Sequence, residues 1–164
     1  MLRMNPIVQA YDFAAEIASS EKFFERSTMV LDELDSEFRP REEMMTIAQH
    51  VAHAAHTLNW FIDGVSRPEG FDLDFEAQAR QVAAVHSLGE ARRQLHSAYV
   101  RVIDFLRSKS PEELEQPLPL GPVMGGSRMR AIFGAMMEHT AHHRGALTVY
   151  ARLLGKVPAM PYGD

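Results

Sequence analysis

Residues 132–154 read IFGAMMEHTAHHRGALTVYARLL. Apolar side chains recur in this stretch at every third or fourth residue, which is the period of an amphipathic α-helix. With about 100° between successive residues, the recurring positions fall within a sector of roughly 80° and share one helix face. These positions are Ile132, Met136, His139, His143, Leu147, Tyr150 and Leu154. The stretch therefore predicts a helix whose core-facing side carries two histidines.

His139 and His143 occupy positions where a helical bundle normally buries hydrocarbon. A single histidine there is usually a hydrogen-bonded core residue. Two histidines on the same buried helix face each need a partner inside an apolar interior. A polar group left unpaired there costs about 1–3 kcal/mol. Neutral imidazole is the commonest ligand for transition metals, and an i,i+4 pair can bind one ion from one helix face. The pair favours a metal site, and a metal-free bundle with stacked core histidines is the alternative.

Composition limits the possible functions. The chain of 164 residues is long enough for one domain with its own core, so we expect a single domain over residues 1–164. Cysteine is absent, so nitrogen and oxygen atoms must hold any metal. The formal net charge of −5 and the scattered arginines argue against nucleic acid as a partner. The sequence shows neither a signal-peptide pattern nor an apolar run of membrane length, so we expect a soluble cytoplasmic protein without a membrane partner.

Three more segments show helical periodicity. They span about residues 6–34, 46–64 and 87–107, and a short helix is expected at 74–84. None of the chain shows the alternation typical of a β-strand. The sequence therefore predicts an all-α four-helix bundle with long connections after the first and third long helices.

Particular residues mark where these helices begin. Thr46 with Gln49, and Ser87 with Glu90, have the spacing of capping boxes. Ser127 is expected to cap the last helix, after a connection rich in proline and glycine.

A third metal ligand must come from another helix, because a catalytic site typically uses three protein ligands and leaves a position for water. His50, His53 and His56 follow one another at i,i+3 spacing in the second long helix, so they cannot all face the interior. Periodicity favours His50, which is nearest to the apolar stripe of that helix. The Glu-x-x-His pairs of di-iron bundles and the His-Glu-x-x-His motif of zinc proteases are both absent.

Several of these features recur in a recognisable order along the chain. They are Thr46-Ile47-Ala48-Gln49 with His53 four residues on, Trp60-Phe61, His139 with His143-Arg144-Gly145, and a Val157-Pro158 tail. This order resembles the DinB/YfiT-like family over essentially the whole chain. The resemblance implies a four-helix bundle with up-up-down-down connectivity, usually a homodimer, that holds nickel or zinc through three histidines. Carried over by position, the ligands are His53, His139 and His143, so resemblance and periodicity differ over His50.

The resemblance also suggests roles for residues near these histidines. Gly145 would permit close approach of another helix, or it is a tolerated weak point in the helix. Arg144 would form an interhelix ion pair or support a ligand, and Glu138 would either accept a histidine N–H or face solvent. The loop Gly121–Gly126 would border the pocket.

Relatives in the wider superfamily include S-transferases and isomerases that use the thiols bacillithiol or mycothiol. The resemblance therefore implies a metal-dependent transferase or hydrolase of small electrophilic compounds, with a low-molecular-weight thiol as co-substrate of a transferase. The alternative is a non-catalytic stress-response protein with a structural metal. Structural zinc sites usually have four protein ligands, and His56 or His142 would have to supply the fourth.

Overall fold

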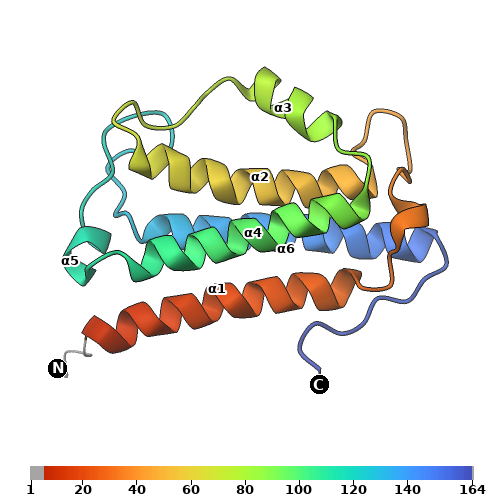
Figure 1. The fold of residues 1–164 in the computed structure, drawn as a ribbon, viewed down its shortest axis with the longest axis horizontal. Helices are drawn as coiled ribbons and strands as arrows, with labels where there is room; N and C mark the ends of the chain where they lie inside the picture. Colours follow the sequence, from red (N-terminus) through yellow and green to blue (C-terminus); the bar gives the residue numbers. More distant parts are fainter. Residues whose placement is uncertain (1–5, 164) are drawn as a thin grey trace.

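The computed structural model describes residues 6–163, with side chains from Phe13 onward, and four long helices dominate this part of the chain (Figure 1). The long helices are α1 (Pro6–Thr28), α2 (Ile47–Ser66), α4 (Leu88–Arg107) and α6 (Ala131–Leu153). Three short helices lie in the connections: η1 (Glu33–Asp35), α3 (Phe75–Ala83) and α5 (Pro111–Leu114). The described residues form no β-strand, and the expected all-α class is confirmed.

The long helices form a ring in which α1 and α2 each pack against both α4 and α6. α1 and α6 run in one direction, whereas α2 and α4 run in the other (Figure 1). Two contacts between α1 and α6 agree with their parallel course: Phe13 lies against Phe133, and Ser20 Oγ is 3.3 Å from Thr140 Oγ1. The order of directions is thus up-down-down-up, and the expected up-up-down-down order is wrong.

The reason lies in the connection between α2 and α4. Residues 67–87 return along the length of α2, and α3 packs on α2 within this connection (Figure 1). The two connections expected to be long, 29–46 and 108–130, stay at the ends of the bundle. Short hydrogen-bonded turns fold residues 29–46. This connection is also held to the start of α4, where Ser36 Oγ, just after η1, accepts the backbone N–H of Leu88. The length of a connection in sequence therefore does not decide whether it runs along the bundle or stays at one end.

The capping signals are confirmed in part. Thr46 and Gln49 form a reciprocal capping box at the start of α2, and Ser87 caps α4 by accepting the N–H of Glu90. Ser127 does not cap α6, which begins after Arg130 without a side-chain cap. The backbone N–H of Ser127 instead donates to Met124 in the preceding turn.

The first helix ends earlier than expected. The Thr28 hydroxyl donates to the Phe24 carbonyl in the last turn of α1. Asp32 and Asp35 then form a capping box that starts η1. A new helix start at Asp32 is incompatible with continuing α1 to residue 34.

The core contains the predicted face of α6. Ile132, Met136 and Leu147 are fully buried, and Tyr150 is 2% exposed. His143 is also buried, whereas His139 and Leu154 are half-buried. The face of α6 that carries the two histidines is therefore buried at His143 and reaches the edge of the core at His139.

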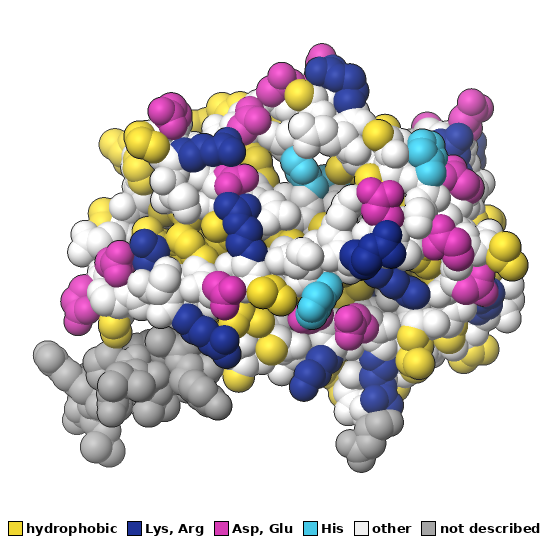
Figure 2. Space-filling view, in the orientation of Figure 1, with side chains coloured by type: hydrophobic (Ala, Val, Ile, Leu, Met, Phe, Trp, Pro, Cys, Tyr) yellow, Lys and Arg dark blue, Asp and Glu magenta, His cyan; other side chains and the backbone are white. Residues whose placement is uncertain are grey.

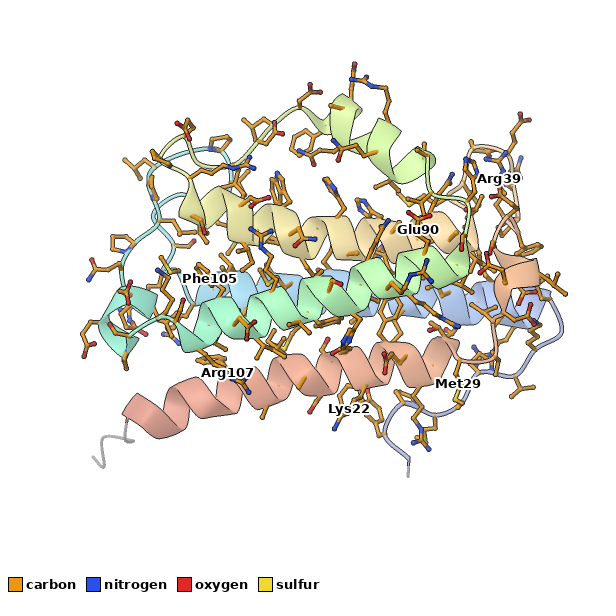
Figure 3. All side chains as sticks on the ribbon, viewed as in Figure 1. Lys22, Met29, Arg39, Glu90, Phe105 and Arg107 are labelled. Carbon is orange, nitrogen blue, oxygen red and sulfur yellow. The ribbon has the colours of Figure 1, made fainter. Side chains whose placement is uncertain are left out.

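The C-terminal segment folds back along α1 (Figure 1). Arg26 Nε donates to the Met160 carbonyl at 2.9 Å, and the Phe23 and Tyr162 rings meet edge to face. Lys22 and Met29 extend from α1 toward this segment (Figure 3). Among the described helices, none combines the length and the hydropathy needed to cross a membrane.

Candidate metal centre

Three histidines from two antiparallel neighbouring helices converge in the middle of the bundle. His53 lies in α2, and His139 and His143 lie one turn apart in α6. One ring nitrogen of each lies within 4.8 Å of those of the other two. The ring centroids are 5.0 Å apart for His53 and His139, 4.8 Å for His53 and His143, and 4.6 Å for His139 and His143.

His50, which periodicity favoured, lies one turn away and has other partners. Its Nδ1 is 2.9 Å from Nδ1 of His143, and its Nε2 is 3.2 Å from the hydroxyl oxygen of Tyr150. Both ring nitrogens are therefore engaged. The structure brings His53 together with the α6 pair, as the resemblance implied, and places His50 behind them.

The convergence point lies at the edge of the core. His143 is 5% exposed, whereas His53 and His139 are half-buried, so the group has a buried side and a side near solvent. Nε2 of His139 is buried and has no hydrogen-bond partner among the described residues. Leaving such an atom unpaired costs about 1–3 kcal/mol, and a metal ion bound at this nitrogen would remove the cost. The residues present fit a metal.

Burial sets the protonation of these rings. Loss of hydration, followed by the proximity of the other histidines, lowers the pKa of His53 to about 4 and that of His143 to about 2. Burial also lowers the pKa of His139. At neutral pH the three imidazoles are therefore uncharged, and this is the form that binds metal.

A model of the DinB superfamily matches residues 21–147, more than half of the chain. The chain belongs to the DinB superfamily. The matched range includes His53, His139 and His143.

Solved structures show the same fold in other members of the superfamily. A DinB-like protein of Bacillus subtilis is 18% identical, with a TM-score of 0.66, covering 90% of this chain and 95% of its own. A DinB-like protein of Bacillus cereus is 16% identical, with a TM-score of 0.61, covering 93% of this chain and 95% of its own. No curated protein matches the chain.

No fourth ligand completes the group in this DinB-superfamily protein among the residues that the structure describes. His142 is exposed, and its ring lies edge-on to His143 at 5.1 Å. His56 lines a cavity of about 520 Å³ between α2, α3 and α4, whose rim includes Glu90 (Figure 3). Figure 2 shows this hollow, with a histidine at its edge. Three histidines, with no fourth donor among the described residues, therefore converge at this point.

A second group of potential ligands lies on the surface of the DinB-superfamily protein. It consists of Glu21, Glu25 and His96. His96 Nδ1 is 2.8 Å from a carboxylate oxygen of Glu21, and His96 is exposed. Because His96 belongs to this separate exposed group, a His96 variant tests whether metal binds there rather than at the three histidines of the bundle.

The structure decides between the alternative roles expected for residues around the histidines. The Arg144 guanidinium lies 5.9 Å from the centre of the Phe23 ring, so it stacks on α1 rather than supporting a ligand. A Cβ at Gly145 would meet no described atom within 4 Å, so none of the described helices approaches it closely, in agreement with a tolerated weak point in the helix. Glu138 is exposed, in agreement with a solvated face.

The loop at residues 121–126 does not border the three histidines. It lies at the end of the bundle where α6 begins (Figure 1), and His139 is two helical turns, about 12 Å, beyond that start. Its shape has a local cause, because a Cβ at Gly125 would lie 2.4 Å from the backbone nitrogen of Gly121. The glycines therefore serve a tight turn.

Proposed function

We propose that this DinB-superfamily protein is a divalent-metal-dependent enzyme that transfers a thiol to small electrophilic compounds or hydrolyses them. His53, His139 and His143 would hold the metal. The observation that carries the proposal is the convergence of three neutral imidazole nitrogens within 4.8 Å at a half-buried position. A site with three protein ligands leaves a coordination position for water or substrate, which is the pattern of catalytic sites.

The chemistry of the donors limits the metal. Three nitrogens without a thiolate suit zinc or nickel, which we propose as the native ions. Such an ion, when bound, would act as a Lewis acid and lower the pKa of a coordinated water or thiol. The protein contributes ligands that are uncharged at neutral pH, and the burial of His143 keeps water from one side of the group.

The proposed transfer joins the sulfur of a low-molecular-weight thiol to an electrophilic carbon. The bond from that carbon to its leaving group breaks, the leaving group departs with the bonding electrons, and the thiol proton passes to solvent. In the hydrolytic version, a water oxygen takes the place of the sulfur. Family membership supports this reaction class.

Metal content tests the ligand assignment. Protein purified without an affinity tag should contain stoichiometric metal by elemental analysis. His139→Ala should lose it, because only two ligands remain, whereas the exposed control His96→Ala should keep it. Metal-free wild type, or equal metal in both variants, would contradict the assignment and favour a bundle with stacked core histidines.

An activity assay then separates catalysis from a structural metal. Zinc- or nickel-loaded protein would be mixed with a chloronitrobenzene as electrophile and with cysteine or bacillithiol as thiol, and release of chloride would be followed. We expect turnover by wild type and none by His139→Ala. A loaded protein that unfolds on metal removal but supports neither transfer nor hydrolysis would instead have a structural metal.

The homodimer is also a proposal. The outer side of α6 carries exposed small residues, Gly134, Ala141 and Gly145, and no described atom lies within 4 Å of a Cβ built at either glycine. The hollow beside Ala141 and Gly145 is bordered by residues 158–161 of the C-terminal segment, and we propose that a second copy packs on this face. Light scattering during size-exclusion chromatography would give the mass, and a monomer at all concentrations would contradict the proposal.

A further inference from the structure

A row of hydrogen-bonding groups starts at Nδ1 of His143. Nδ1 of His143 is 2.9 Å from Nδ1 of His50, and Nε2 of His50 is 3.2 Å from the Tyr150 hydroxyl. That hydroxyl lies 3.2 Å from the backbone carbonyl oxygen of Met45. His50, His143 and Tyr150 are all at most 9% exposed, so water does not readily replace any of these contacts.

The carbonyl group sets the direction of the whole row. A carbonyl oxygen only accepts, so the Tyr150 hydroxyl must donate its single proton to Met45. The hydroxyl oxygen is then the acceptor for His50, which must donate from Nε2. A neutral imidazole carries one N–H, so Nδ1 of His50 accepts, and Nδ1 of His143 must be the donor. The proton of His143 is thereby placed on Nδ1, which leaves the lone pair on Nε2.

We propose that His50 and Tyr150 are positioning residues that hold His143 in the tautomer and orientation in which Nε2 binds the metal. The inference rests on the proposed function for the identity of the ligand, but the direction of the row follows from the hydrogen bonds alone. Because the row ends at a carbonyl group, which cannot pass a proton on, it orients His143 and is not a path for protons.

The start of α2 fixes the far end of the row. Met45 directly precedes Thr46, whose side chain and backbone are both held by Gln49 in the capping box. Burial raises the pKa of Tyr150, so the phenol keeps the proton that it donates. The capping box of Thr46 and Gln49, which the sequence predicted, therefore also fixes the Met45 carbonyl group. The tautomer of His143 depends on this acceptor.

Two amide substitutions at His50 separate positioning from packing. In His50→Asn the amide oxygen can take the place of Nδ1 and accept from His143. In His50→Gln the amide is one bond longer, so it reaches the position of Nε2 near Tyr150 and lacks the acceptor at Nδ1. Loss of the group that orients a metal ligand typically weakens metal binding 10- to 100-fold.

We therefore expect His50→Asn to bind zinc within a few-fold of wild type and His50→Gln to bind at least about tenfold more weakly. Affinities would come from competition with a chromogenic zinc chelator, with His96→Asn as the surface control. A role in packing alone predicts the opposite order, because glutamine is closer to histidine in size. Equal affinities, or weaker binding by His50→Asn, would overturn the inference.

A second readout does not need the metal. Nitrogen-15 shifts of the imidazole rings in the zinc-free protein report the tautomer of His143, and we expect the proton on Nδ1 in wild type. Tyr150→Phe removes the link to Met45 and should give a mixture of tautomers, which keeps the test available if the His50 variants do not fold. A proton on Nε2 in wild type would overturn the inference. Wild type with the proton on Nδ1 that does not bind zinc would refute the proposed function and leave the orienting row in place.

Discussion

The buried histidines make the metal-free protein sensitive to acid. An unfolded histidine has a pKa near 6.5, whereas the pKa is about 4 for His53 and about 2 for His143 in the folded protein. Between these values the unfolded chain binds more protons, so the free energy of unfolding is at its full value above pH 6.5 and falls as the pH falls through 4. Urea unfolding of chelator-treated protein at a series of pH values measures this slope.

The control for that slope is a variant without the two rings. His53→Leu combined with His143→Leu should show a shallower decrease between pH 6.5 and 4, because fewer groups gain protons on unfolding. Identical slopes for the variant and wild type would contradict the assignment of the acid sensitivity to these histidines.

For individual residues, the sequence could predict which histidines are buried but not which side chains they contact. Periodicity correctly placed His143 in the core, and it also placed His50 there, as the structure confirms. It could not show that the partner of His50 is Tyr150, because helical spacing carries no information about neighbouring helices. The resemblance selected His53, and the structure brings His53 to the α6 pair. The ligand role of the three residues stays a prediction.

Two glycines within helices should respond oppositely to the same substitution. A Cβ at Gly64 in α2 would lie 2.2 Å from the Phe71 ring, whereas a Cβ at Gly145 in α6 would meet no described atom within 4 Å. Gly64→Ala should therefore destabilise the protein by about 1–3 kcal/mol through overpacking. Gly145→Ala should stabilise it by up to about 1 kcal/mol, because alanine favours the helix. Thermal unfolding of the two variants checks both signs.

The outcome for Gly145→Ala also bears on the proposed homodimer. If a second copy packs closely on this face of α6, the added methyl group would meet the partner and the gain in stability would vanish. Unfolding measured at low and high protein concentration separates these two effects.

Helix positions were easier to predict than the connections between them. The signals for the starts of α2, α3 and α4 involve residues three positions apart, and Thr46, Asp74 and Ser87 all act as caps. The route of each connection depends on where distant segments pack. The placement of α3 along α2, which makes α2 and α4 parallel, has no local signal comparable to a cap. The early end of α1 did have a local signal, the capping pair Asp32 and Asp35, but the helical periodicity of the apolar residues obscured it.

For the whole molecule, the proposed metal would link α2 to α6 across the middle of the bundle. A ligand that binds only the folded state stabilises it by about 2.7 kcal/mol when its free concentration is 100 times Kd. For a chain of this size, such a gain raises the melting temperature by about 5–11 °C. We expect this rise when zinc is added to chelator-treated wild type.

His139→Ala and His96→Ala again provide the matched pair. The first should show little change in melting temperature with zinc, and the second should behave as wild type does. A zinc effect that persists in His139→Ala would place the stabilising ion elsewhere, for instance at the surface group formed by Glu21, Glu25 and His96.

The separation of the three histidines along the chain has a consequence for biogenesis. Translation delivers α2 well before α6, so His53 leaves the ribosome when His139 and His143 have not yet been made. A nascent chain therefore offers at most one of the three proposed ligands until the last helix emerges. Capture of the ion by all three residues would therefore have to wait for the synthesis of α6, and until then the chain would have to be kept soluble without the link between α2 and α6.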